Sequence, residues 1–136
     1  MEKRGLERKE IRLRPVGTAY LTEREDTMRI VIHPQYAEGL EGIESLDSVY
    51  VLYWMDRLSE DDRKILKVHP QGDRSKPLRG VFSLRSPMRP NPIGLTRVRL
   101  LKREGNVLLV KGLDALDGSP IIDIKSGEQK GAEHER

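Results

Sequence analysis

The sequence predicts a mainly β fold, a compact antiparallel β-barrel-like domain with one or two short helices. Segments of strand composition outnumber segments with helical spacing, and no alternation of strand and helix indicates a parallel sheet. A length of 136 residues is typical of a single domain. Together these observations favour a small antiparallel barrel or sandwich built around one core.

The predicted strands are short, apolar and bounded by turn residues. In chain order they span residues 11–21 (interrupted near Pro15 and Gly17), 28–33, 48–55, 80–84, 93–101, 106–113 and 119–124. The third, SVYVLYWM, is rich in β-branched and aromatic residues and has the length of a buried central strand. The Glu104-Gly105-Asn106 turn separates the fifth strand from the sixth and predicts a hairpin.

Two segments favour helices. Residues 36–46 carry three apolar side chains at helical spacing, although Gly39 and Gly42 weaken this helix. Ser59, followed three residues later by Asp62, predicts a short helix with a capped N-terminus. We therefore expect helices only in the connections between strands.

The domain is expected to span residues 11–125. Before it, residues 1–10 form a charged arm, and after it residues 126–136 form a polar tail without an apolar anchor. The charged N-terminus lacks the apolar region of a signal peptide, and no apolar run approaches the roughly 20 residues of a membrane span. We therefore expect a cytoplasmic protein with no membrane contact.

Composition excludes several kinds of chemistry. The chain has no cysteine, which removes disulfides, thiolate catalysis, zinc–thiolate sites and iron–sulfur clusters. Its three histidines lie far apart in the sequence, so we expect no metal site. No Walker loop and no G-x-G-x-x-G motif is present. Charged residues make up 35% of the chain against only five Asn and Gln, a composition typical of thermophiles.

Positive charge is concentrated in one stretch. Residues 74–103 contain nine Lys or Arg and no Asp or Glu, whereas the rest of the chain is mixed or acidic. Such a segment indicates an anion-binding surface, and nucleic acid is the commonest large anion. The alternative is a solvated strand edge, on which Lys and Arg prevent edge-to-edge pairing.

The segment with the most candidate functional residues is RSPMRPNPIG, residues 85–94. Its three prolines exclude a helix and a central strand, and indicate a stiff, exposed loop. Arg85 and Arg89 are suited to hold phosphate or carboxylate, and Asn91 is suited to read an adenine edge or to cap a turn. The alternative is a structural connector whose arginines lie over apolar surface.

Two further segments carry candidate site residues. In LDALDGSP, residues 113–120, the carboxylate of Asp114 is suited to bind a ribose or an adenine amino group, or to take a proton. Asp117 precedes a glycine in a turn signal, and both aspartates have the alternative role of turn and cap residues. Asp56 and Arg57 directly follow the most apolar strand, where they either border a cleft or form an ordinary surface pair.

These segments together resemble the TsaA/TrmO family. The resemblance is carried by GVF at 80–82, RSPxRPNPIGL at 85–95, LDALDGSP at 113–120 and IDIK at 122–125, and covers roughly residues 13–125. It implies a compact β-barrel-like domain that forms homodimers and binds S-adenosylmethionine without a Rossmann domain. The implied activity is N6-methylation of N6-threonylcarbamoyladenosine, the modified base beside the anticodon in certain tRNAs.

The resemblance also implies site residues. Those expected to bind the cofactor are Asp56, Arg57, Arg85, Leu95, Leu113, Asp114, Ala115 and Leu116. RNA contacts are expected at Arg79, Arg89 and Asn91. Asp114 and Asp117 are the candidate catalytic residues, because a carboxylate can orient the N6–H group or take its proton.

The sequence departs from the family pattern after the first strand. Family members carry a loop of about a dozen or more residues with a Pro-Arg-Gln-like element, which helps to cover the cofactor. Here residues 20–27 run directly into the next strand and contain no such element. The alternative function is therefore a non-catalytic module of the same fold that binds RNA or an adenosine ligand.

Overall fold

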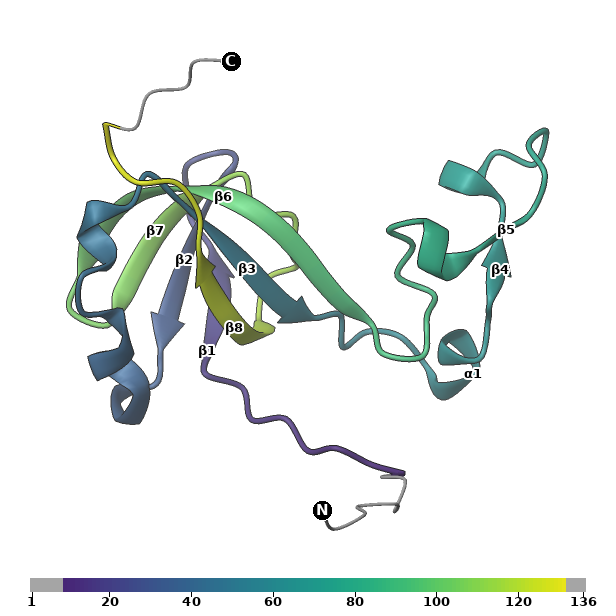
Figure 1. The fold of residues 1–136 in the computed structure, drawn as a ribbon, viewed down its shortest axis with the longest axis horizontal. Helices are drawn as coiled ribbons and strands as arrows, with labels where there is room; N and C mark the ends of the chain where they lie inside the picture. Colours follow the sequence, from purple (N-terminus) through teal and green to yellow (C-terminus); the bar gives the residue numbers. More distant parts are fainter. Residues whose placement is uncertain (1–8, 132–136) are drawn as a thin grey trace, which may run out of the picture.

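Six strands close into an antiparallel barrel in the computed structural model, which describes residues 9–131 (Figure 1). Neighbouring strands around the barrel follow the order β1-β2-β7-β6-β3-β8. Their bounds are β1 Gly17–Leu21, β2 Thr27–Ile32, β3 Ser48–Trp54, β6 Ile93–Glu104, β7 Val107–Lys111 and β8 Ser119–Ser126. Closure pairs every one of these strands on both sides. The predicted mainly β barrel is confirmed.

The core fills the barrel with side chains from alternate strand positions. On β3, Val49 and Val51 are fully buried and Tyr53 nearly so, whereas Tyr50 between them is exposed. This alternation is expected where one face of a strand points inward. Because β3 pairs with both β6 and β8, the prediction of a buried central strand at 48–55 is confirmed.

The β6–β7 hairpin is also confirmed. Gly105 adopts a φ of +61° in the turn, a conformation that glycine takes at little cost. The Asn106 side-chain amide donates a hydrogen bond of 2.6 Å to the Ile32 carbonyl and ties the hairpin to β2. Strand β6 continues to Glu104, beyond the predicted end at 101, because its exposed residues still pair with β7.

Two predicted elements that precede β3 differ clearly from the structure. The helix expected at 36–46 is replaced by two 3-10 helices, η1 (Pro34–Leu40) and η2 (Ile43–Ser45). Gly42 separates them with a φ of +88°, which a continuous helix does not allow. The first strand begins at Gly17 rather than at residue 11, and Ile11 is 76% exposed because residues 11–15 lie outside the ladder.

Between β3 and β6 the chain leaves the barrel and forms a projecting arm, residues 56–92 (Figure 1). The arm contains α1 (Glu60–Arg63), β4 (Lys67–Val68), η3 (Pro70–Gly72), β5 (Arg79–Gly80) and η4 (Val81–Ser83), with β4 antiparallel to β5. The strand predicted at 80–84 is therefore largely wrong. The Leu84 N–H donates to the Val81 carbonyl at 3.1 Å and closes the 3-10 turn of η4 instead, and the Ser83 hydroxyl adds a hydrogen bond of 2.7 Å to the Gly80 carbonyl.

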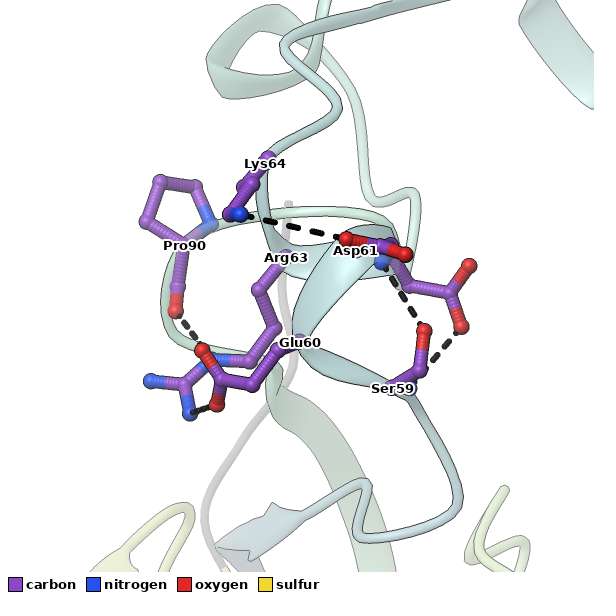
Figure 2. A network of polar contacts seen from close by, with 7 residues as sticks. Ser59, Glu60, Asp61, Arg63, Lys64 and Pro90 are labelled. Atoms are coloured by element: carbon purple, nitrogen blue, oxygen red, sulfur yellow. Dashed lines mark hydrogen bonds and ion pairs between the residues drawn. The ribbon is translucent and has the colours of Figure 1, made fainter.

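At the base of the arm, α1 ties the outgoing chain to the returning chain (Figure 2). The predicted cap is confirmed, since the Ser59 hydroxyl accepts from the Asp62 N–H and the Asp62 carboxylate accepts from the Ser59 N–H. Nε of Arg63 donates to the Pro90 carbonyl at 2.7 Å, and the guanidinium lies 5.5 Å from the Trp54 ring centroid. Arg63 thus connects both segments of the arm to the end of β3.

The structure describes only part of the two chain ends. Strand β8 passes residue 125, and the following backbone stays on the barrel: the Asp47 N–H donates to the Glu128 carbonyl at 2.7 Å, and the Lys130 N–H donates to the Ser45 carbonyl at 2.8 Å. Of the predicted N-terminal arm, residues 1–8 lie outside the described residues, as do residues 132–136 of the predicted tail. Within residues 9–131, no helix is long and apolar enough to cross a membrane.

Gly94 on β6 offers a test of the packing between strands. A Cβ at this position would lie 2.3 Å from Cε2 and Cζ of the Tyr53 ring, which is buried and cannot swing away. We expect Gly94→Ala to lower the free energy of unfolding, measured in urea, by about 1–3 kcal/mol.

Gly39→Ala is the matched control. A Cβ there has nothing within 4 Å, so the free energy of unfolding should stay the same or rise by up to about 1 kcal/mol. A Gly94→Ala protein as stable as the parent would show that the Tyr53 ring does not pack against Gly94 in this way.

Candidate functional site

A cavity of about 780 Å³ opens where the arm meets the barrel. This volume is within the usual range of small-molecule sites, roughly 300–1,000 Å³. Its walls come from the end of β3, from the loop after η4, from the start of β6 and from the loop before β8. The lining residues are Leu52, Tyr53, Met55, Asp56, Arg57, Leu58, Phe82, Leu84, Arg85, Ser86, Pro87, Arg89, Ile93, Gly94, Leu95, Thr96, Asp114, Ala115, Leu116 and Ser119.

The rim of the cavity is apolar and open to solvent. Phe82 is 80% exposed, Leu116 56% and Leu95 41%. Exposed large apolar side chains gathered around a concave surface mark binding sites, because burying them against a ligand is favourable. The rim is therefore suited to hold the flat apolar face of a ligand.

Tyr53 lies in the floor of the cavity. Its hydroxyl lies 3.1 Å from Thr96 Oγ1 and donates a hydrogen bond to the Asp114 carbonyl. Burial raises the pKa of Tyr53, and the nearby Asp114 carboxylate raises it further. The phenol therefore keeps its proton at neutral pH and holds the backbone of Asp114 against β3.

Tyr53 and Thr96 were not among the predicted site residues. The signal that points to Tyr53 is a polar atom within the most apolar strand, but the sequence does not tell which residue it contacts. Thr96 directly follows the RSPxRPNPIGL segment. Only the antiparallel pairing of β3 with β6 brings these two side chains together.

The residues that the family resemblance assigns to a cofactor meet at this cavity, with one exception. Those that line it are Asp56, Arg57, Arg85, Leu95, Asp114, Ala115 and Leu116. The exception is Leu113, whose side chain is 8% exposed and belongs to the barrel core. Its position in the sequence is adjacent to the site, but its side chain points into the core.

Arg85 is one of three cations that line the cavity, and its side chain is exposed. Within the described residues its guanidinium makes one hydrogen bond, from Nη1 to the Leu95 carbonyl at 3.3 Å. Nε and Nη2 remain for an anionic ligand. Of the other two cations, Arg57 donates from Nη2 to the Asp117 carbonyl at 3.0 Å and lies 3.9 Å from the Asp56 carboxylate.

The two candidate catalytic aspartates lie in different surroundings. Asp114 lines the cavity. Asp117 does not, and its Oδ1 accepts a hydrogen bond of 2.8 Å from the N–H of Leu21, at the end of β1. Asp117 therefore fixes the loop before β8 to β1, which is the turn role that the sequence left open as the alternative.

The three predicted RNA contacts all lie on the arm, and of these only Arg89 lines the 780 Å³ cavity. Arg89 is half-buried, and it donates from Nε to the Ser86 carbonyl at 2.9 Å and from Nη2 to the carbonyls of Val81 and Leu84. Its guanidinium holds the loop after η4 in shape, in agreement with the structural alternative. Arg79 lies on the arm, and Asn91 is exposed between two prolines.

The connection between β1 and β2 is as short as the sequence predicts. Residues 22–26 fold on themselves: Oγ1 of Thr22 accepts from the Arg24 N–H at 3.1 Å and donates to the Thr27 carbonyl at 3.0 Å. This turn lines a separate hollow of about 410 Å³ together with Leu113 and Ala115. In the part of the chain that the structure describes, no group of three or more His, Asp or Glu side chains is placed to hold a metal ion.

Several archaeal proteins are similar in sequence to this chain. One from Methanothermobacter thermautotrophicus, named probable S-adenosyl-L-methionine-binding protein, is 46% identical over 128 residues, which cover 85% of this chain and 89% of the relative. An Archaeoglobus fulgidus protein named S-adenosyl-L-methionine-binding protein is 55% identical over 96 residues, 71% of this chain and 66% of the relative. A second A. fulgidus protein, named probable S-adenosyl-L-methionine-binding protein, is 50% identical over 101 residues. The match covers 74% of this chain but only 26% of that relative.

The fold is similar to solved structures as well. TrmO from Pseudomonas aeruginosa matches 89% of this chain with a TM-score of 0.67 and 26% identity, and the match spans 56% of that protein. The family model described as the tRNA-methyltransferase O N-terminal domain matches residues 15–128, a range that contains the whole cavity lining. The chain belongs to the family of the tRNA-methyltransferase O N-terminal domain.

Proposed function

We propose that this protein binds S-adenosylmethionine in the 780 Å³ cavity and methylates N6 of threonylcarbamoyladenosine in tRNA. One observation carries the proposal. The two segments with the most specific family motifs, residues 85–95 and 113–120, form opposite parts of the same cavity although they are distant in the sequence. Because tRNA is the proposed substrate, we also propose that the protein acts in the cytoplasm.

The cavity suits this cofactor in size and in chemistry. Phe82, Leu95 and Leu116 offer apolar surface for the adenine ring, and Arg85 offers N–H donors for the carboxylate of the methionyl part. When bound, S-adenosylmethionine supplies a methyl group on a positively charged sulfur. A strong anion beside that sulfur would favour the ground state over the transition state, so neutral contacts are expected there.

Asp114 is the residue best placed to act on the substrate amine. The N6 lone pair is delocalised into the base, so the amine is a poor nucleophile and its alignment matters most, with about 7–11 kcal/mol available from positioning. The Asp114 carboxylate would orient the N6–H group or take its proton. Tyr53 supports this role, because its hydroxyl holds the Asp114 backbone.

We also propose that the protein is a homodimer, as the family resemblance implies. The arm carries apolar side chains that the chain itself does not cover: Leu66 is 57% exposed and Leu78 54%. Side chains of this kind are typical of surfaces that meet another protein.

The short connection between β1 and β2 favours a second candidate function. Residues 22–26 line the smaller hollow and are absent from the lining of the main cavity. A site without this cover is more open to water, which weakens electrostatic catalysis more than ligand binding. The second candidate is a module that binds S-adenosylmethionine without transferring its methyl group, and it predicts cofactor binding with no methyl incorporation into tRNA.

Arg85→Ala tests the cofactor site. A hydrogen bond between charged groups contributes about 1.5–3 kcal/mol, so we expect the Kd for S-adenosylmethionine in titration calorimetry to rise about 10- to 100-fold. Arg99→Ala is the control, since Arg99 is exposed on β6 but lies outside the cavity. Equal binding by parent and Arg85→Ala, together with a much lower unfolding temperature of Arg85→Ala, would give Arg85 a structural role instead.

Asp114→Asn and Asp117→Asn separate the two aspartates. We expect Asp114→Asn to lower methyl incorporation into tRNA by about 10²- to 10⁴-fold, the range for loss of general acid–base catalysis. Asp117→Asn should keep most of the activity, because an amide oxygen can still accept from the Leu21 N–H. Radiolabelled methyl transfer at saturating tRNA measures both, and the opposite ranking would make Asp117 the catalytic residue.

A further inference from the structure

A second, larger cavity of about 1160 Å³ runs along the arm. It is lined by β4, β5, the loop between them and the loop after η4. Four consecutive residues, Leu84, Arg85, Ser86 and Pro87, line this cavity and the 780 Å³ cavity as well. The two cavities therefore border the same segment, and a ligand longer than either cavity could contact both.

The charge of this arm cavity has one sign. Its lining includes the cations Lys67, Arg74, Lys76, Arg79 and Arg85 together with His69, and it includes no Asp or Glu. Among the ion pairs found within residues 9–131, none involves Lys67, Arg74 or Lys76. Cations gathered on a concave surface without neutralising carboxylates attract polyanions.

The acidic residue nearest in sequence, Asp73, is absent from the lining and forms none of the ion pairs found within residues 9–131. The Asp73 carboxylate accepts hydrogen bonds from the N–H and the hydroxyl of Ser75, at 2.9 and 2.6 Å, and these hydrogen bonds lower the pKa of Asp73. Its role is to close the turn between η3 and β5. The Lys76 N–H in turn donates to the Asp73 carbonyl at 3.0 Å.

The same turn is held from the other side by His69. Nδ1 of His69 donates to the Lys76 carbonyl at 2.8 Å, across seven residues of the loop. Arg74 and Lys76 therefore stand on a backbone that is already folded before a ligand arrives. Less conformational entropy is lost on binding when the backbone is ordered in advance.

We propose that the arm is a phosphodiester clamp, which holds the RNA strand next to the target nucleotide while that nucleotide enters the 780 Å³ cavity. The inference rests on the proposed function, because it takes RNA as the substrate. Lys67, Arg74 and Lys76 bind backbone phosphates, and Arg85 lies at the point where the strand passes from one cavity to the other. Phosphate contacts of this kind position a nucleic acid without reading its sequence.

RNA is the occupant that both cavities favour together. A basic groove alone would bind any polyanion, but this groove leads into a cavity with an apolar rim and the volume of a nucleoside-sized ligand. An extended ribonucleotide chain supplies phosphates to the basic groove and a base to the cavity with the apolar rim.

The salt dependence of RNA binding tests the clamp. The probe is a fluorescent anticodon stem-loop transcript, and anisotropy gives its Kd for the full-length chain at several KCl concentrations. In the triple variant Lys67→Gln, Arg74→Gln, Lys76→Gln, we expect the slope of log Kd against log salt to fall by about 2, since each lost phosphate contact in a single strand removes about 0.7. The Kd at moderate salt should rise at least tenfold.

The matched control removes the same charge from the barrel. Arg99→Gln, Lys102→Gln, Lys111→Gln also changes one arginine and two lysines, all exposed, on β6 and β7. It should change the slope by less than half as much as the arm variant. The charge-retaining variant Lys67→Arg, Arg74→Lys, Lys76→Arg should restore binding, and the affinity for S-adenosylmethionine should be the same in all of these proteins.

The outcomes separate the clamp from the proposed function. If the parent binds the transcript and the arm variant binds it with the same slope, or if the barrel variant has an equal effect, the clamp is wrong while the RNA substrate stands. If the parent neither binds the transcript nor methylates tRNA, the proposed function fails and the clamp fails with it. A loss of dimer mass in the arm variant, measured by light scattering, would assign these cations to subunit contact instead.

Discussion

The pairing of β3 on both sides is the constraint on which the rest of the structure depends. β3 hydrogen-bonds to β6 along one edge and to β8 along the other, and this closes the barrel. Its inward side chains fill the core, and its end delivers Asp56 and Arg57 to the cavity rim. Tyr53 contributes both to the packing of the barrel and to the shape of the cavity, because its ring packs over Gly94 of β6 and its hydroxyl holds the Asp114 backbone.

The site therefore depends on the rigid barrel for its floor and on the arm for its opposite wall. The floor side chains Tyr53 and Thr96 lie on paired strands, where positions are determined by the ladder. The wall is a proline-rich loop whose shape is maintained by Arg89 through three backbone carbonyls. Because the strand floor and the loop are already ordered, the protein loses little conformational entropy when a ligand binds in the cavity.

The arm is the least expected part of the molecule and gives the domain its elongated shape (Figure 1). It has little core of its own, and several of its apolar side chains are exposed. Arg63 connects its two ends at the base through a hydrogen bond to the Pro90 carbonyl (Figure 2), and its guanidinium also lies over the Trp54 ring at the end of β3. The cations of the arm line the 1160 Å³ cavity together with the exposed Leu78, whereas the exposed Leu66 lies outside that lining.

The sequence by itself determined what depends on neighbours along the chain. Alternation and β-branched composition located β3, the Glu104-Gly105-Asn106 turn located the hairpin, and the Ser59 cap located α1. The motif segments 85–95 and 113–120 both contribute residues to the 780 Å³ cavity. Only the tertiary structure decided which of their side chains face it: Asp117 bonds to Leu21, 96 residues away, Arg89 binds its own loop, and Leu113 enters the core. Such roles depend on hydrogen-bond partners and packing neighbours that chain closure brings together, and no local pattern of residues specifies these.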